Sequence, residues 1–165
     1  VGKTTYEFPK PHDYKPVLRD VLLDCPEGPG VQYGEKKKKI FELVPAGGYW
    51  RDIDPEIAKE YMKSCWNMEG GRTGILRRMS LDEPCLTVLT SPSQKQTERC
   101  HPLEARPFTV RENARCQMFP DEWEFCGPVA SQYKQVGNAV PVGLAFDVAK
   151  EIHKSLDNLN KSEVN

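Results

Sequence analysis

Long apolar runs, paired cysteines and a complete phosphate-binding loop are all missing from this sequence of 165 residues. A membrane-spanning helix needs about 18 consecutive apolar residues, and no such run exists; the first residues also lack the apolar core of a signal peptide. The six cysteines are widely spread and form no C-x-x-C pair. This pattern predicts reduced thiols in a cytoplasmic protein, with no disulfide framework, bound metal or membrane segment.

Residues 1–5 (VGKTT) look like the end of a phosphate-binding loop, but the earlier glycine and the preceding strand that the motif requires are lacking. The sequence therefore does not support a nucleotide site there. Hydrophobic residues make up only 38% of the chain, while 14 prolines and 12 glycines indicate many turns. The length suits one domain with its own core, and the composition predicts a loop-rich mixed fold.

The net charge of −1 conceals a basic middle segment. Residues 72–115 contain eight basic and five acidic side chains, and most of the cations are arginines. The planar guanidinium of arginine suits phosphates and guanine edges better than the point charge of lysine does. The four lysines of residues 36–39 are typical of a solvated helix face, with contact to a phosphate backbone as the alternative.

Three short helices are predicted in the first half of the chain. They cover residues 17–23, residues 35–44 and a segment that Asp54 caps and that runs to about Lys63, with Pro55 at its first position.

The basic segment is expected to be largely extended. Residues 75–79 would place Arg77 and Arg78 on opposite faces, so that at most one of them reaches a given groove of DNA. Residues 86–90 alternate like a β-strand. Residues 91–96 form a polar loop, which is either an ordinary solvent-exposed turn or a DNA contact.

Residues 106–120 contain a capping box, with Thr109 as the cap and Glu112 three residues later, and this predicts a short helix. Arg111 and Arg115 lie four residues apart on one face of that helix. Such a like-charged pair costs a few tenths of a kcal/mol unless an anionic group lies opposite.

Residues 132–145 combine a predicted turn at Gly137 with a predicted helix start, in which Asn138 is the cap and Pro141 lies in the first turn. The helix that follows carries an apolar stripe at steps of four, made of Leu144, Val148, Ile152 and Leu156. Its amino end would suit an anion, because unpaired amides and the helix dipole converge there. An ordinary capped C-terminal helix is the alternative.

Two C-terminal blocks together resemble the DNA (cytosine-5) methyltransferases. Residues 106–121 (RPFTVRENARCQMFPD) are similar to the family's ninth conserved block, and residues 133–141 (YKQVGNAVP) to its tenth and last. Upstream, the runs GGYWRDI, GGRTGILRRMS and PCLTVLTSP are similar to the target recognition region of bacterial modification enzymes. The resemblance covers nearly the whole chain.

The family's cofactor glycine block, Pro-Cys nucleophile block, Glu-Asn-Val block and Gln-x-Arg-x-Arg block are not found. The resemblance therefore implies the C-terminal part of a methyltransferase, either one subunit of a split enzyme or a piece of a longer one, that works with a catalytic N-terminal subunit or segment. Cys85 follows Pro84, but Leu86 and Thr87 come next instead of the family's glutamine. No catalytic residue is therefore predicted in this chain.

The implied fold class is α+β. Residues 1–20 would be a connector, and residues 21–130 a small, loop-rich mixed β domain for target recognition that includes the ninth block. Residues 131–165 would hold the tenth block and a C-terminal helix, which packs on an absent α/β catalytic domain that depends on S-adenosylmethionine.

Residues that match the family's motifs carry implied roles. Those bordering the amino-acid end of the cofactor S-adenosylmethionine would be Asn138, Ala139 and Val140. Those bracing the recognition region would be Arg106, Arg111 and Arg115. Thr87 looks like a threonine that contacts the DNA backbone, and the remaining DNA contacts are assigned to Arg72, Thr73, Arg77, Arg78, Ser91, Gln94 and Lys95.

The sequence thus predicts the DNA-recognition and cofactor-pocket part of a DNA (cytosine-5) methyltransferase. Such an enzyme transfers a methyl group from S-adenosylmethionine to a cytosine flipped out of double-stranded DNA. It would serve restriction–modification in the bacterial cytoplasm, in association with the nucleoid. The alternative is a non-catalytic DNA-binding or interaction protein derived from a methyltransferase.

Overall fold

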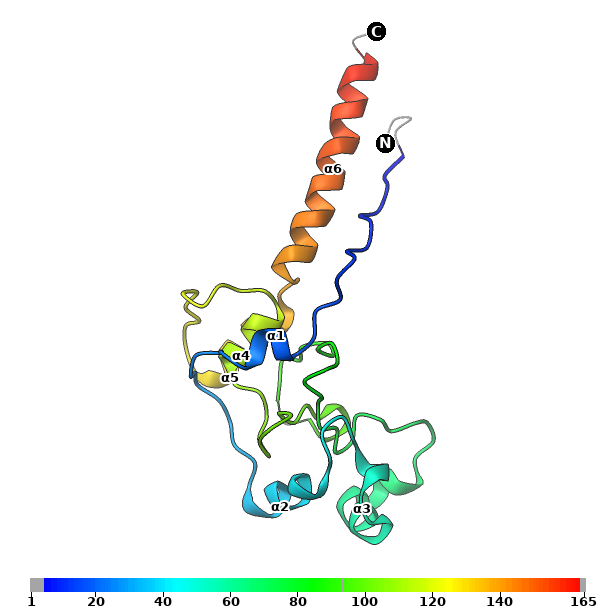
Figure 1. Cartoon of the computed structure of the whole chain (residues 1–165), viewed down its shortest axis with the longest axis vertical. Helices are drawn as coiled ribbons and strands as arrows, with labels where there is room; N and C mark the ends of the chain where they lie inside the picture. The colour runs from blue at the N-terminus through cyan, green and yellow to red at the C-terminus, as the bar shows by residue number, and fades with distance from the viewer. Residues whose placement is uncertain (1–4, 93, 164–165) are drawn as a thin grey trace.

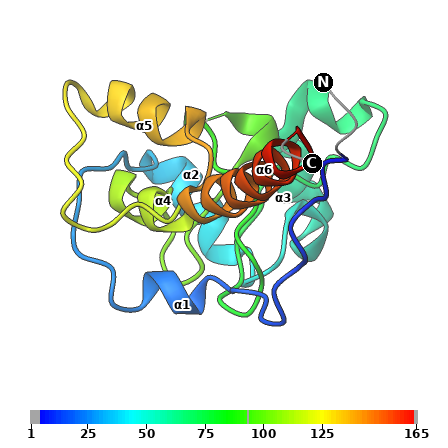
Figure 2. The same ribbon diagram turned by 90° about the horizontal axis from the view of Figure 1, so that it is seen from above.

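A long C-terminal helix projects from a body of short helices and loops in the computed structural model of the chain (Figure 1). The structure describes residues 5–92 and 94–163, so residues 1–4 of the predicted connector and the last two residues lie outside it. The described part of the connector runs beside the long helix in both views (Figures 1 and 2). His12 Nε2 lies 2.8 Å from Asp147 Oδ2 and links the two segments.

The regular elements of the described residues are six α-helices and three 3-10 turns. The α-helices are α1 (Arg19–Leu22), α2 (Glu35–Leu43), α3 (Pro55–Met62), α4 (Val110–Cys116), α5 (Val129–Asn138) and α6 (Val142–Glu163). The 3-10 turns are η1 (Trp50–Asp52), η2 (Lys63–Asn67) and η3 (Lys95–Thr97).

The three short helices predicted in the first half of the chain are confirmed as α1, α2 and α3. Side-chain caps explain where α3 and α4 begin. Asp54 Oδ1 accepts hydrogen bonds from the amides of Glu56 and Ile57 at the start of α3. At the start of α4, Thr109 Oγ1 accepts from the Glu112 amide at 3.1 Å, while the Glu112 carboxylate accepts from the Thr109 amide at 2.7 Å. The predicted capping box is therefore confirmed.

Three groups of buried side chains form the core. The first lies between α2, α3 and the turns beside them, and its members include Tyr33, Phe41, Trp50, Met62 and Leu76. The second joins α1 to the middle of the chain through Leu18, Leu22, Met79 and Phe108. The third packs α4 on α5 through Val110, Ala114, Tyr133 and Val136. Figure 2 shows α4 and α5 on one side of α6, with α3 on the other.

A buried carboxylate links the parts of the first core. Glu98 is fully buried, and its oxygens accept from Tyr61 Oη at 2.5 Å and from the Leu76 amide at 2.6 Å. Lys37 Nζ lies 2.6 Å from the same carboxylate. Lys37 is thus an exception to the solvated face expected for residues 36–39, because its charge compensates a buried anion that would otherwise be very costly.

Residues 86–90, predicted as a β-strand, have no regular secondary structure and make no ladder with any described segment. The described residues contain isolated bridges only, one parallel between Arg78 and Cys100 and one antiparallel between Cys100 and Pro107. Burial does not alternate along these residues either, because Leu86 and Thr87 are exposed while Val88, Leu89 and Thr90 are all half-buried. An α+β class with a mixed β recognition domain stays a prediction.

The turn predicted at Gly137 is wrong. Gly137 lies inside α5, which continues to Asn138, and the chain then turns through Ala139 to Pro141 before α6 begins at Val142. Asn138 is therefore the last residue of one helix and does not cap the next. The Ala145 amide donates to the Pro141 carbonyl at 3.0 Å in the first turn of α6.

Candidate DNA and cofactor site

The turn between α5 and α6 presents the three residues predicted to border the cofactor. Asn138 and Val140 are exposed, the latter to 60%, whereas Ala139 is half-buried. The side chain of Gln117 holds this turn from beneath: its Nε2 donates to the carbonyls of Val136 at 3.2 Å and Ala139 at 3.0 Å.

The backbone of Gln117 contributes a third bond, because its carbonyl accepts from the Val142 amide at 3.1 Å. Gln117 itself is 7% exposed. One residue of the ninth block thus fixes both ends of the turn in the tenth block. The Val142 amide is consequently not free for an anion, and the exposed donors of the turn include the side-chain amide of Asn138.

Gly137 brings α5 against the middle of the chain. A Cβ atom at this position would lie 2.6 Å from the carbonyl carbon of Leu89 and from the Thr90 amide nitrogen. Such distances are well inside van der Waals contact, so only glycine fits without backbone movement. The tenth block is therefore packed directly on the segment that leads into the predicted DNA-contacting loop.

The arginines expected to brace the recognition region form hydrogen bonds and ion pairs with other residues of the chain. Arg106 Nη1 and Nη2 each donate to a Glu112 oxygen at 2.8 Å, and Arg106 also bonds both oxygens of Glu104. Although burial alone would raise the pKa of the Glu112 carboxyl, the hydrogen bonds from Arg106 and from the Thr109 amide hold that pKa below its usual range.

The other two arginines of the block anchor the loop after α4. Arg111 donates to the carbonyls of Pro120 at 3.1 Å and Trp123 at 2.7 Å. Arg115 makes two bonds to Asp121, at 2.9 and 2.6 Å, and also pairs with Asp24. Carboxylates therefore lie beside Arg115, which offsets the repulsion expected between two cations four residues apart. These contacts join parts of the chain to one another, and a role in bracing the recognition region stays a prediction.

His101 is buried next to the Arg106–Glu112 pair. The Leu103 amide donates to Nδ1 at 3.2 Å, so Nδ1 carries no proton, and Nε2 faces a Glu112 oxygen at 3.6 Å. Burial lowers the pKa of His101, and the neighbouring charge of Arg106 acts in the same direction while Glu112 opposes it. A neutral imidazole is the form that this environment favours.

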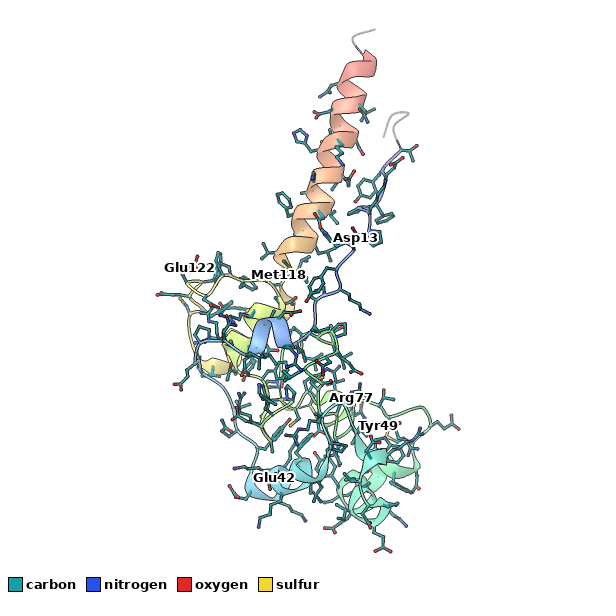
Figure 3. All side chains as sticks on the ribbon, in the orientation of Figure 1. Asp13, Glu42, Tyr49, Arg77, Met118 and Glu122 are labelled. Carbon is teal, nitrogen blue, oxygen red and sulfur yellow. The ribbon has the colours of Figure 1, made fainter. Side chains whose placement is uncertain are left out.

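Arg77 and Arg78 point to opposite faces, as predicted. Arg78 turns into the body, where its guanidinium donates to the carbonyls of Phe41, Val44 and Pro102 at 3.0–3.3 Å. It thereby satisfies carbonyls at the end of α2. Arg77 turns the other way, toward Glu83 at 3.6 Å and the ring of Tyr49 (Figure 3).

Two further residues assigned to DNA are tied to backbone carbonyls. Arg72 Nη1 donates to Cys65 at 3.4 Å and also to Trp66, and its guanidinium stacks on Trp50 at 4.9 Å from the ring centre. Lys95 Nζ donates to the carbonyls of Tyr61 at 2.6 Å and Met62 at 3.3 Å, at the end of α3. Both cations are engaged in holding the fold.

The smaller polar residues of the predicted contact set remain accessible. Thr73, Thr87 and Gln94 are exposed and Ser91 is half-buried. Thr87 and Ser91 line one small cavity together with Arg99, a residue that the sequence did not single out.

The structure adds two residues to those that the sequence indicated. Gln117 lies in the ninth block, but glutamine in a helix end has no local pattern that predicts its partners. Arg99 belongs to the basic segment. Its position beside Arg77 depends on the bridge between Arg78 and Cys100, which are distant in sequence.

The described part of the chain gives little support for a reactive cysteine, a metal site or a membrane-spanning helix. All six cysteines are free, and Cys85 packs against the Leu18–Phe108 core. No group of three His, Cys, Asp or Glu side chains there is arranged to hold a metal ion. Among the helices of residues 5–92 and 94–163, none is both long and apolar enough to cross a bilayer.

The two C-terminal blocks meet at Gln117, and comparison with known sequences shows the family to which they belong. The profile of the C-5 cytosine-specific DNA methylases matches residues 2–154, and the chain belongs to this family. It is 54% identical to the Type II methyltransferase M.Sau96I of Staphylococcus aureus over 96% of the chain and 37% of that protein. It is 51% identical to M.Eco47II of Escherichia coli, over 94% of the chain and 39% of that protein. The chain thus spans less than two-fifths of the length of these relatives.

Proposed function

We propose that this chain provides DNA-site recognition and one edge of the cofactor pocket in a DNA (cytosine-5) methyltransferase of a bacterial restriction–modification system. The observation that carries the proposal is the Gln117 clamp, which holds the exposed turn at Ala139 in a chain 54% identical to a Type II methyltransferase. We place the enzyme in the bacterial cytoplasm, at the nucleoid, where its DNA substrate lies.

S-adenosylmethionine fits the exposed turn at its amino-acid end. The side-chain amide of Asn138 offers donors to a carboxylate, and Val140 offers an apolar surface beside them. When bound, this cofactor supplies the methyl group. The chain's own part is to keep the turn rigid through Gln117 and to hold the recognition segment against it through the close approach at Gly137.

The nucleophilic cysteine belongs to another part of the enzyme in this proposal. Cys85 lies against buried apolar side chains, and its Sγ donates to the Leu86 carbonyl at 3.0 Å, which suits a packed thiol better than a nucleophile facing DNA. The relatives are more than twice as long as the aligned region, which leaves ample chain for the cofactor and nucleophile blocks.

The α6 helix is the element that would join the two parts. Leu144, Ile152 and Leu156 of its apolar stripe are exposed by 53, 46 and 54%. Fully burying such a side chain is worth about 1.5–3 kcal/mol, and about half of each is already covered, so a partner surface would gain about 1 kcal/mol from each. We propose that the catalytic α/β domain covers this stripe.

Among the predicted DNA contacts, the geometry favours Arg77, Thr73, Thr87, Ser91 and Gln94. Each is at least partly accessible. Arg72, Arg78 and Lys95 instead stabilise the recognition region through the backbone carbonyls that they bind. We propose that Arg77 reads a base, because a guanidinium can donate two hydrogen bonds to a guanine edge.

A methyl-transfer assay tests this division of labour. The chain is mixed with double-stranded plasmid DNA and radiolabelled S-adenosylmethionine, either alone or with the N-terminal region of the enzyme supplied as a second polypeptide. We expect label in the DNA only when both polypeptides are present. Label transferred by the chain alone would overturn the proposal.

Tight binding to one DNA sequence by the chain alone, with no methylation in either mixture, would instead favour a non-catalytic DNA-binding protein. Weak binding with a shallow salt dependence by the chain alone agrees with the proposal, because few phosphate contacts are available without the second part.

A further inference from the structure

A single backbone bridge determines which arginines of the basic segment face outward. The Cys100 amide donates to the Arg77 carbonyl at 3.0 Å, and the Met79 amide donates to the Cys100 carbonyl at 3.0 Å. This is a parallel pairing of Arg78 with Cys100. Side chains alternate along extended backbone, so Arg78 and Cys100 share one face, and Arg77 and Arg99 share the other.

The inner face of this bridge is closed. Cys100 is fully buried, and Arg78 donates to carbonyls inside the body. Arg77 and Arg99 are each half-buried, and Arg99 lines the small cavity that Thr87, Ser91 and Asn113 also border. Arg99 therefore lies between the base-reading candidate Arg77 and the segment proposed to follow the DNA backbone.

The two guanidinium groups on the outer face interact unfavourably. Burial lowers the pKa of Arg99, the neighbouring Cys85 opposes this, and the positive charge of Arg77 lowers the pKa further. Their Nε atoms are both buried without a hydrogen-bond partner in the described chain. The hydrogen bond of Arg99 goes from Nη1 to the Glu98 carbonyl at 2.9 Å.

Carboxylates that would neutralise this pair are scarce. Glu83 lies 3.6 Å from Arg77 Nη2, which is longer than a direct hydrogen bond, and no described carboxylate forms an ion pair with Arg99. By contrast, Arg106 and Arg115 are each paired with two carboxylates. Two adjacent, partly desolvated cations with so little compensation favour the arrival of an anion.

We propose that Arg99 binds a backbone phosphate of the duplex, next to the base that Arg77 reads. A base edge offers neutral acceptors to the guanidinium of Arg77. These acceptors take up its hydrogen bonds but leave the positive charge of Arg99 uncompensated. A phosphate oxygen accepts from the free side of the guanidinium and neutralises the pair as well. Arg99 would then fix the position of the DNA strand, and Arg77 would read sequence from that position. This inference rests on the proposed function.

The test uses the natural gene product that contains this sequence, with its target located first by mapping methylated cytosines in plasmid DNA. Binding constants for a duplex with the target and for a scrambled duplex are measured over a range of salt concentrations. We expect Arg99→Gln to weaken binding to both duplexes by the same factor, roughly tenfold. The slope of log K against log salt should fall in magnitude by about 0.9, the value for one lost phosphate contact. Arg99→Lys should retain the slope.

Arg19→Gln is the matched control, because the Arg19 charge is already paired with Asp82 at 2.7 Å and its loss should leave the slope unchanged. A changed ratio of target to scrambled affinity for Arg99→Gln, with an unchanged slope, would show base reading and overturn the inference. Equal loss of binding in the Gln and Lys variants, together with a lower melting temperature in both, would assign Arg99 to structure. Unsubstituted protein that neither binds nor methylates DNA would overturn the proposed function as well.

Discussion

At the residue scale, Gln117 is the side chain on which the exposed turn depends most. Removing its amide in Gln117→Ala leaves the Ala139 carbonyl without its donor, which costs about 1–3 kcal/mol if water cannot replace the bond, whereas the Val136 carbonyl still accepts from the Ala139 amide at 3.2 Å. We expect a reduced free energy of unfolding in urea, and weaker binding of S-adenosylmethionine by the complete enzyme. Gln135→Ala is the control, because Gln135 also bonds a carbonyl, that of Cys126 at 2.8 Å, but is exposed. Equal losses in the two variants would contradict a special role for Gln117.

For a single charged side chain, local sequence predicts some features of its placement and misses others. Alternation along an extended segment correctly separated Arg77 from Arg78, because that rule needs no knowledge of distant residues. It did not reveal that Arg72 and Lys95 donate to the carbonyls of a turn and a helix end. Lys95 meets Tyr61 across more than thirty residues of sequence, and only the folded chain places such partners together. The sequence therefore indicated a basic segment but not the intramolecular partners of its cations, and which of them contact DNA stays a prediction.

At the element scale, the packing of α5 on residues 89–90 should be sensitive to a single methyl group. Gly137→Ala places a Cβ 2.6 Å from backbone atoms of Leu89 and Thr90, which cannot rotate away. We expect a loss of about 1–3 kcal/mol in unfolding free energy, as for other overpacked sites, despite the higher helix propensity of alanine. Gly71→Ala is the control, since its Cβ would meet only Thr73 Cγ2 at 3.5 Å. A more stable Gly137→Ala protein would contradict this close packing.

Gly137 also shows why some elements could be predicted and others could not. The starts of α3 and α4 were predicted because Asp54 and Thr109 cap helices through bonds to residues two or three positions away. The turn was misplaced because conformational freedom at Gly137 was taken as the reason for glycine, whereas close approach of a distant segment is the reason. Residues 86–90 were misjudged similarly, since strand pairing requires a partner that alternation alone does not identify.

At the scale of the whole molecule, α6 is long for the contacts that it makes. Helix α6 extends over 22 residues, and the described connector runs beside it, joined by the pair of His12 with Asp147 (Figure 1). Much of its stripe remains exposed within this chain. Helices are stabilised mainly by packing of an apolar face, so the extent of α6 suggests that a further surface covers it in the working enzyme. The sequence predicted the stripe, and its exposure is the structural reason for proposing a partner.

A charge placed on the apolar stripe of α6 should weaken assembly with the catalytic domain and leave the folding of this chain unchanged. Ile152 is 46% exposed, so Ile152→Glu should scarcely change the unfolding of this chain by itself. In the two-polypeptide mixture it would place a carboxylate against an apolar surface. We expect at least tenfold less methylation at limiting concentration, because about 1 kcal/mol of apolar burial is lost and a charge must be desolvated as well. Leu103→Glu is the matched control, because Leu103 is 60% exposed and lies outside α6. If α6 carries the contact with the catalytic domain, raising the concentration of the N-terminal polypeptide restores methylation by the Ile152→Glu protein. Equal methylation by the Ile152→Glu and unsubstituted proteins at every concentration would show that the catalytic domain binds elsewhere.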